Sequence, residues 1–277
     1  GMGDVSGTGS LQVGGSGSAK WTLIPGDSAA PSAPTVYRVS GSLRYSVGGQ
    51  VISIPLYPVP ITVYPNASLS MQYFIETDVR GDDPFTPEVE PSVPFSLGLW
   101  AKNNGAGTAG DVRVQSGQPK VVENHQGALI DFRLIGSQVN SEARSPSLDV
   151  SMGDILPGEV AVARWLMISS LQGRFTSYSA NIKSTNGFDT PEFAIVDEAA
   201  VNPMLHVVRA DVPFDDGRPD FLGSIVATAG NVPDRVWLSS GSAEPVTADI
   251  HPTVQMFGDH ARVTSVPEAG WQFGRAH

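Results

Sequence analysis

Short stretches in which apolar and polar residues alternate recur along the chain, and this alternation predicts β-strands. Between residues 35 and 76 they read TVYRVSGSLRYSV, VISIPL, PITVYP and LSMQYFIE. A pair of glycines, Gly48 and Gly49, separates the first two stretches. Because two glycines between apolar, β-branched runs favour a tight turn, we expect a β-hairpin there.

The pattern continues through the rest of the chain, in segments such as PFSLGLWAKNN, ALIDFRLIG, MLHVVRADV and TVQMF. The segment EVAVARWLMISSLQ, Glu159 to Gln172, has a composition that also suits a helix. Its valines and other large side chains nevertheless alternate, and the turn pair Pro157-Gly158 precedes it. We therefore interpret it as a buried strand.

Composition supports a fold built from strands. The chain has 277 residues, of which 30 are glycine and 22 are proline. Since these residues interrupt helices, their density favours short strands joined by turns, and we predict an all-β protein. No run approaches the roughly 18 apolar residues that a membrane-spanning helix needs, so we expect no membrane insertion.

Charge and cysteine content exclude several classes of function. The formal net charge is −11, which argues against a nucleic-acid partner because phosphate binding needs a basic surface. The chain contains no cysteine. Disulfides, thiolate metal sites and cysteine nucleophiles are therefore excluded.

Changes in composition divide the sequence into five segments. Residues 1–18 are rich in Gly and Ser and are typical of a flexible lead-in. A first β module is expected at 19–78, an acidic, proline-rich connector at 79–94 and a β-sandwich at 95–200. Residues 201–277 form either a small C-terminal β module or strands that complete the neighbouring module.

Two motifs in the centre of the chain carry a family resemblance. The first, PFSLGLWAKNNGAGTAGDVRVQSG, runs from an alternating strand into a turn, and the second, GDILPGEVAVARWLM, opens a strand. Their characteristic residues are Asn103, Gly105, Gly107 and Ala109, followed by Ile155, Pro157, Gly158 and Trp165. Over about residues 84–183 the chain resembles the cell-adhesion-related immunoglobulin-like domains of bacterial surface and secreted proteins. The resemblance implies an immunoglobulin-like β-sandwich in this part of the chain and no catalytic residue. Together with the strand patterns on either side, it leads us to expect two or three immunoglobulin-like β-sandwich modules in tandem.

The segment ETDVRGDDPFTPEVEPSVPF, Glu76 to Phe95, combines many carboxylates with four prolines. Calcium prefers six to eight oxygen ligands, often carboxylates from one loop, so the segment is a candidate calcium site. The candidate ligands are Asp78, Asp82, Asp83, Glu88 and Glu90. Acidic surface loops are more often solvated, so the solvated connector is the favoured interpretation. The triplet Arg80–Asp82 reads Arg-Gly-Asp, but three residues carry too little information to identify an integrin ligand.

A second acidic cluster lies in ADVPFDDGRPDFLG and consists of Asp211, Asp215, Asp216 and Asp220. It is the second candidate calcium site, and two of its carboxylates are alternatively a pair for glycoside cleavage. Glycosidase carboxylates commonly come from different strands that flank a cleft. Four carboxylates on one loop therefore disfavour the catalytic interpretation.

Sequence motifs of catalysis are absent. The chain has no Gly-x-Ser-x-Gly, no P-loop and no His-Glu-x-x-His, so we expect neither an enzyme nor a cofactor other than calcium. The tryptophans lie on strand candidates and serve either as core residues or as a platform for carbohydrate. They are Trp21, Trp100, Trp165, Trp237 and Trp271.

These observations and the resemblance predict a non-catalytic structural or adhesive segment of a larger bacterial extracellular or cell-surface protein. Gly1 ahead of Met2 is typical of a cleaved tag, which fits a segment of a longer chain. The expected partners are neighbouring domains of that chain and protein or carbohydrate at a cell surface. A carbohydrate-binding module is the alternative, and part of a carbohydrate-active hydrolase is the further alternative.

Overall fold

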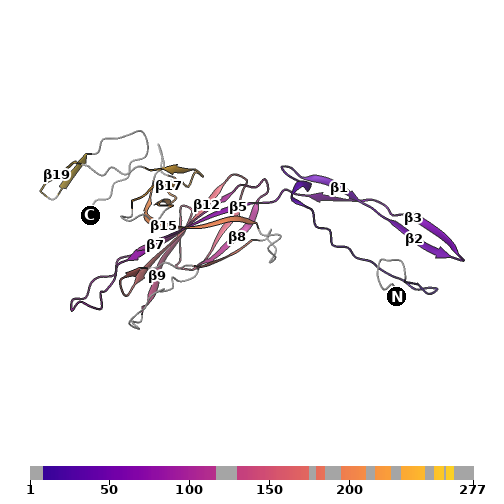
Figure 1. The fold of residues 1–277 in the computed structure, drawn as a ribbon, viewed down its shortest axis with the longest axis horizontal. Coiled ribbons are helices and arrows are strands. Elements are labelled where there is room, and N and C mark those ends of the chain that lie inside the picture. The colour runs from indigo at the N-terminus through magenta and orange to yellow at the C-terminus, as the bar shows by residue number, and fades with distance from the viewer. Residues whose placement is uncertain are drawn as a thin grey trace. The chain divides into compact units, whose positions relative to one another are not determined.

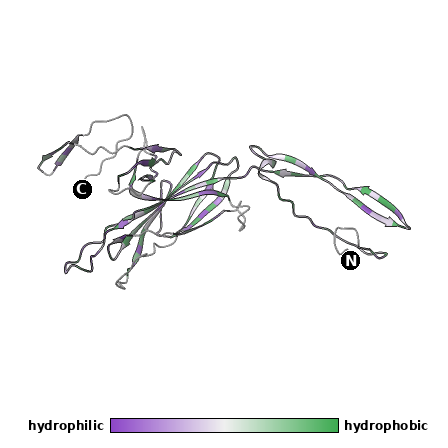
Figure 2. Ribbon diagram, in the orientation of Figure 1, coloured by the Kyte–Doolittle hydropathy of each residue, from purple (hydrophilic) through white to green (hydrophobic). Residues whose placement is uncertain are grey.

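The chain folds into two compact units, Gly1–Asn66 and Ala67–His277. The computed structural model describes residues 9–116, 130–174, 179–184, 195–209, 216–225, 232–246, 253–258 and 260–264 (Figure 1). Within these ranges the secondary structure is all β, apart from a short 3₁₀ turn, η1 (Asp27–Ala29). Hydrophobic and hydrophilic residues alternate along many of the strands (Figure 2), as the sequence pattern predicts.

The strands of the N-terminal unit form two antiparallel pairs, which we call the ribbon. Strand β1 (Thr35–Val39) pairs with β4 (Val59–Val63), and β2 (Ser42–Val47) pairs with β3 (Gln50–Pro55), both antiparallel. The turn between β2 and β3 is made by Gly48 and Gly49, with φ angles of 59° and 84°. Positive φ at both central residues defines the type I′ turn that suits the twist of a hairpin. The predicted hairpin is confirmed.

The C-terminal unit contains the remaining described strands. These are β5 (Leu69–Ile75), β6 (Asp78–Val79), β7 (Phe95–Asn103), β8 (Ala109–Ser116), β9 (Phe132–Val139), β10 (Glu142–Arg144), β11 (Asp149–Ile155), β12 (Val160–Ser169), β13 (Gly173–Arg174), β14 (Ala180–Lys183), β15 (Val196–Val208), β16 (Asp220–Gly223), β17 (Arg235–Trp237), β18 (Ala243–Pro245), β19 (Thr253–Phe257) and β20 (His260–Thr264). Nine of them form one sheet in the order β10-β9-β12-β7-β5-β15-β16-β17-β18. A second sheet has the order β11-β8-β14.

One core fills the space between these two sheets. Leu97 and Leu99 of β7, Val112 and Val114 of β8, and Trp165 of β12 are all fully buried in it. Two packed sheets with alternating inward side chains are consistent with a β-sandwich. The segment from Glu159 is strand β12, as predicted, and its neighbours β7 and β9 pair with it on either side.

A second core covers the other face of the large sheet. Phe74 of β5 stacks on Phe221 of β16 with ring centroids 4.5 Å apart, and Trp237 of β17 meets Phe74 edge-on at 4.9 Å. Gly98 of β7 lies beneath the Phe221 ring, where a β-carbon would approach the ring to 2.4 Å. The strands at the centre of the sheet are therefore buried on both faces.

The boundaries between units differ from those expected from composition. Strand β5, assigned by sequence to the first module, pairs with β7 and β15 in the middle of the large sheet. Strand β15 runs across the expected boundary at residue 200, and β16 to β18 continue the same sheet. The described strands after residue 200 thus include strands that complete the neighbouring module. Over the described residues, no helix is long and apolar enough to cross a membrane.

Candidate functional site

The acidic segment after residue 76 lies between β5 and β7 inside the C-terminal unit; it begins with the short strand β6, which pairs with β13, and continues as a loop. Its backbone is held to a distant part of the chain. The N–H of Asp82 donates to the carbonyl of Ser170 (3.2 Å), and the N–H of Gln172 donates to the carbonyl of Asp82 (3.1 Å). The loop therefore connects two strands of one sheet rather than two units.

Carboxylates of this loop accept hydrogen bonds from the loop itself. Glu90 accepts the backbone N–H of Asp83 (2.9 Å) and the hydroxyl of Thr86 (2.9 Å), while Asp82 accepts the backbone N–H of Glu90 (3.0 Å). Asp83 accepts the N–H of Phe85 (3.0 Å). The hydrogen bonds from Asp83 and Thr86 lower the pKa of Glu90 below its usual 4.5, because they favour the ionised carboxylate. These carboxylates thus act as acceptors for the fold of the loop.

The two remaining candidate ligands of the first cluster are both exposed. Asp78 forms an exposed ion pair with Arg174 (2.9 Å), and Glu88 is exposed. Gly81 is buried, and a β-carbon there would come within 2.7 Å of the Leu171 backbone. The glycine of the Arg-Gly-Asp triplet is therefore required by packing. No group of three or more His, Cys, Asp or Glu side chains in the described ranges could hold a metal ion, and calcium binding stays a prediction.

Half of the second acidic cluster can be placed, since Asp211 and Asp215 lie outside the described residues. Asp220 is fully buried and accepts the backbone N–H of Ser239 (2.6 Å). Asp216 accepts the hydroxyl of the same serine (3.0 Å). Both carboxylates therefore hold the turn that follows β17.

Three of the tryptophans belong to the cores of the C-terminal unit. Trp100, Trp165 and Trp237 are 6%, 0% and 4% exposed, which places them away from any binding surface. The indole N–H of Trp165 donates to the carbonyl of Ser147 (3.0 Å), and that of Trp100 to the carbonyl of Leu238 (2.9 Å). For these three the core interpretation is confirmed. Trp21 is exposed, and Trp271 lies outside the described residues.

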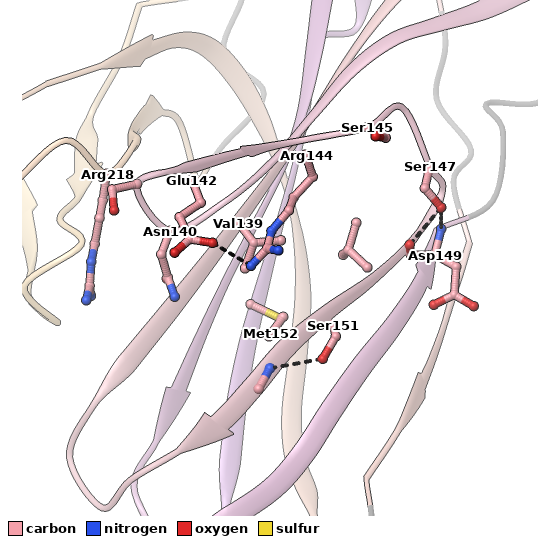
Figure 3. A pocket seen from close by; sticks show the side chains of 13 residues that line it. Val139, Asn140, Glu142, Arg144, Ser145, Ser147, Asp149, Ser151, Met152 and Arg218 are labelled. Atoms are coloured by element: carbon pink, nitrogen blue, oxygen red, sulfur yellow. Dashed lines mark hydrogen bonds and ion pairs between the residues drawn. The ribbon is translucent and has the colours of Figure 1, made fainter.

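A groove of about 770 Å³ lies beside β10 and β11 (Figure 3). Strand β10 is an edge of the large sheet and β11 is an edge of the smaller one, so the groove follows the open side between the two sheets. Its labelled side chains are Val139, Asn140, Glu142, Arg144, Ser145, Ser147, Asp149, Ser151, Met152 and Arg218. Val139, Val150 and Met152 are buried beneath it.

The groove is polar and its charges are balanced. Glu142 is ion-paired with Arg144 (2.6 Å), and Arg218 lies near Asp216 (3.6 Å). Serine hydroxyls supply several of the remaining polar groups. None of these lining residues was predicted from the sequence: all but Arg218 come from residues 139–153, a stretch that matches no catalytic or binding motif. The density of serines between residues 137 and 151 is the one local signal that pointed to them.

The N-terminal ribbon has an exposed apolar face. In the β2–β3 segment Leu43 is paired with Ile54, Tyr45 with Ile52 and Val47 with Gln50. Paired residues of antiparallel strands share a face, so the apolar side chains gather on one side. This apolar ribbon face consists of Leu43 (50% exposed), Tyr45 (40%), Val47 (63%), Ile52 (37%) and Ile54 (44%).

The opposite face of the same segment is mostly polar. It carries the pairs Arg44–Ser53 and Ser46–Val51. In the β1–β4 segment Tyr37 is paired with Ile61 and Val39 with Val59, on the face opposite Arg38, while the exposed Val36 lies on the same face as Arg38. The sequence predicted the hairpin, but the exposure of its apolar face depends on long-range packing.

Comparison with protein-family models, with curated proteins and with solved structures finds no match to this chain. The acidic loop, the groove and the ribbon are therefore the features from which a function can be inferred.

Proposed function

We propose that this chain is a non-catalytic structural or adhesive module of a larger bacterial extracellular or cell-surface protein. In this role the β-sandwich is a stable scaffold and the N-terminal ribbon is a contact surface for protein. The observation that carries the proposal is the exposed apolar ribbon face. The cell-surface location rests on the resemblance of residues 84–183 to bacterial adhesion-related domains.

An uncovered apolar sheet face needs a partner for physical reasons. A sheet with one apolar face is stable when that face is buried against another layer. A single two-stranded hairpin is marginally stable in water, because it buries too little apolar surface to offset the entropy of ordering its backbone. Exposed apolar patches of this kind mark interaction sites. A covering protein surface would stabilise the ribbon and fix its position.

The contacts of the motif residues support an immunoglobulin-like sandwich as the scaffold. The Asn103 amide donates to the carbonyls of Gly107 (2.8 Å) and Ile155 (2.9 Å). The N–H of Gly158 donates to the carbonyl of Asn103 (2.8 Å). The two motifs that carry the resemblance are therefore hydrogen-bonded to each other, and Trp165 of the second lies in the core between the sheets.

The proposal is tested by titrating the chain with the apolar dye bis-ANS at low protein concentration. The double variant Tyr45→Thr/Ile52→Thr replaces a cross-strand pair of the apolar ribbon face with residues that keep strand propensity. We expect it to lose roughly half of the dye fluorescence. Arg44→Thr/Ser53→Thr changes the pair on the opposite face and serves as the matched control. Equal dye binding by all three proteins would show that the apolar ribbon face is not an available contact surface.

The groove favours a second candidate, a carbohydrate-binding module. Hydroxyl, amide and paired charged groups around an open groove suit a neutral ligand that both donates and accepts hydrogen bonds. Nuclear magnetic resonance titration with neutral oligosaccharides tests it. Shifts confined to residues 139–153 and lost in Arg144→Ala would support this candidate, and an unchanged spectrum would remove it.

A further inference from the structure

We propose that the surface that covers the apolar ribbon face is the same face of a second copy of this chain. The inference rests on the proposed role of the ribbon as a contact surface and names its partner. The two ribbons would pack face to face around a two-fold axis, so that each contributes the same residues to one interface.

The distribution of charge favours the ribbon as the meeting point of two copies. Residues 1–66 carry three basic and two acidic residues, a net charge of +1, whereas residues 67–277 carry fourteen basic and twenty-six acidic residues, a net charge of −12. Two copies therefore repel each other through their C-terminal units. The N-terminal unit is the part of the chain through which they approach without this repulsion.

The placement of the arginines within the ribbon permits close approach. Between Asp27 and Glu76 the charged residues are Arg38 and Arg44. Arg44 is paired with Ser53, on the face opposite the Tyr45–Ile52 pair, and Arg38 with Pro60, opposite the Tyr37–Ile61 pair. Packing the apolar faces together leaves both arginines in water. The covering surface must itself be uncharged and apolar, because an unpaired charge buried against these side chains is strongly unfavourable. A second ribbon meets this requirement.

The size of the face predicts a reversible association. A strand rises about 3.3 Å per residue and neighbouring strands lie about 4.8 Å apart, so each ribbon segment presents a face of about 200 Å². The apolar ribbon faces of two copies together give about 400 Å², below the roughly 1,200–2,000 Å² of stable specific complexes. We therefore expect the pair to form and separate with chain concentration.

Sedimentation velocity of the full chain between about 2 and 200 µM tests the inference. We expect the wild-type chain to shift from monomer toward dimer over this range. Tyr45→Thr/Ile52→Thr is expected to stay monomeric, while Arg44→Thr/Ser53→Thr dimerises like the wild type. A wild-type chain that is monomeric at every concentration would overturn the inference.

Cysteine cross-linking is a second test, and it traps the dimer covalently even when the two copies associate weakly. Because the chain has no cysteine, a single introduced cysteine forms at most one bond between copies. Under mild oxidation we expect a cross-linked dimer from Ile52→Cys, on the apolar ribbon face, and none from Ser53→Cys, on the opposite face. Equal cross-linking of the two variants would contradict face-to-face packing.

The outcomes separate this inference from the proposed function. Loss of bis-ANS binding in Tyr45→Thr/Ile52→Thr, together with a monomeric wild-type chain, would keep the contact surface and reject the second copy. Binding of that monomer to vesicles of phosphatidylcholine and phosphatidylglycerol would identify a lipid surface instead and overturn the inference. Dye binding that the variant leaves unchanged would reject the contact surface itself.

Discussion

Asn103 shows how one side chain can hold several turns of a β-sandwich. Its amide is fully buried at the end of β7, where the nitrogen donates to the carbonyls of Gly107 and Ile155. Its oxygen accepts the backbone N–H groups of Ser68 (3.2 Å) and Gly105 (3.0 Å). The asparagine therefore joins the ends of β5, β7, β8 and β11.

Replacing this residue should cost the fold much of its stability. Asn103→Ala leaves buried backbone groups without partners, and we expect it to lower the free energy of unfolding by about 3 kcal/mol. Urea unfolding followed by tryptophan fluorescence measures the change. Asn104→Ala, at the exposed neighbouring position, is the control and is expected to change stability by less than about 0.5 kcal/mol. Equal stability of the two variants would contradict the structural role of Asn103.

Glu90 makes the acidic loop sensitive to pH. The pKa of Glu90 is lowered in the folded chain because its hydrogen bonds favour the ionised carboxylate. These bonds therefore stabilise the loop at pH values above the usual pKa of 4.5, and this stabilisation is lost as the pH falls through the lower pKa of the folded chain. We expect the Asp83 amide resonance to follow a titration with its midpoint below 4.5. In Glu90→Gln this titration should disappear. A midpoint at or above 4.5 would show that the loop does not favour the ionised carboxylate.

For single residues the sequence indicated the right positions but not their roles. The motif that contains Asn103 predicted a turn, yet its bonds to Ser68 and Ile155 span 35 and 52 residues and leave no local signal. The density of carboxylates indicated a solvated connector, with a calcium site as the alternative. In the structure Asp82, Asp83 and Glu90 accept N–H groups of their own loop, a local arrangement that composition does not distinguish from metal ligation.

At the scale of elements, local sequence patterns predicted where strands lie but not which strands pair or pack together. The glycine pair of the β2–β3 hairpin and the alternation in β12 act within a few residues, and both predictions are confirmed. The pairing of β5 with β15 and the packing of Phe221 on Gly98 join segments more than a hundred residues apart. The groove beside β10 and β11 could not be predicted either, because β10 and β11 are edges of two different sheets and the strand pattern does not show how those sheets pack.

The acidic loop as an element should be insensitive to calcium. Because its central carboxylates already accept loop hydrogen bonds, we expect millimolar calcium to leave the thermal midpoint of the chain unchanged relative to chelator. Differential scanning calorimetry measures both conditions. A rise of several degrees in calcium would contradict this expectation. The variant Asp82→Asn/Asp83→Asn would then locate the site. Loss of the calcium-induced rise in this variant would show that these carboxylates are metal ligands.

In the whole molecule, two units of opposite character share one chain. The C-terminal unit buries two cores around its large sheet, whereas the N-terminal ribbon leaves the apolar face of its hairpin exposed. The acidic charge is concentrated in the C-terminal unit. A unit with two buried cores and a ribbon with an exposed apolar face fit a stable scaffold that carries a separate contact element.

Amide hydrogen exchange of the wild-type chain at about 1 and 100 µM is the decisive test of the ribbon as an uncovered contact element. We expect the amides of β1 to β4 to exchange rapidly in the dilute sample and to become protected in the concentrated one. The amides of β5, β7 and β12 should stay equally protected in both. Full protection of the ribbon in the dilute sample would contradict its role as a contact element, because the apolar ribbon face would then already be covered within one chain.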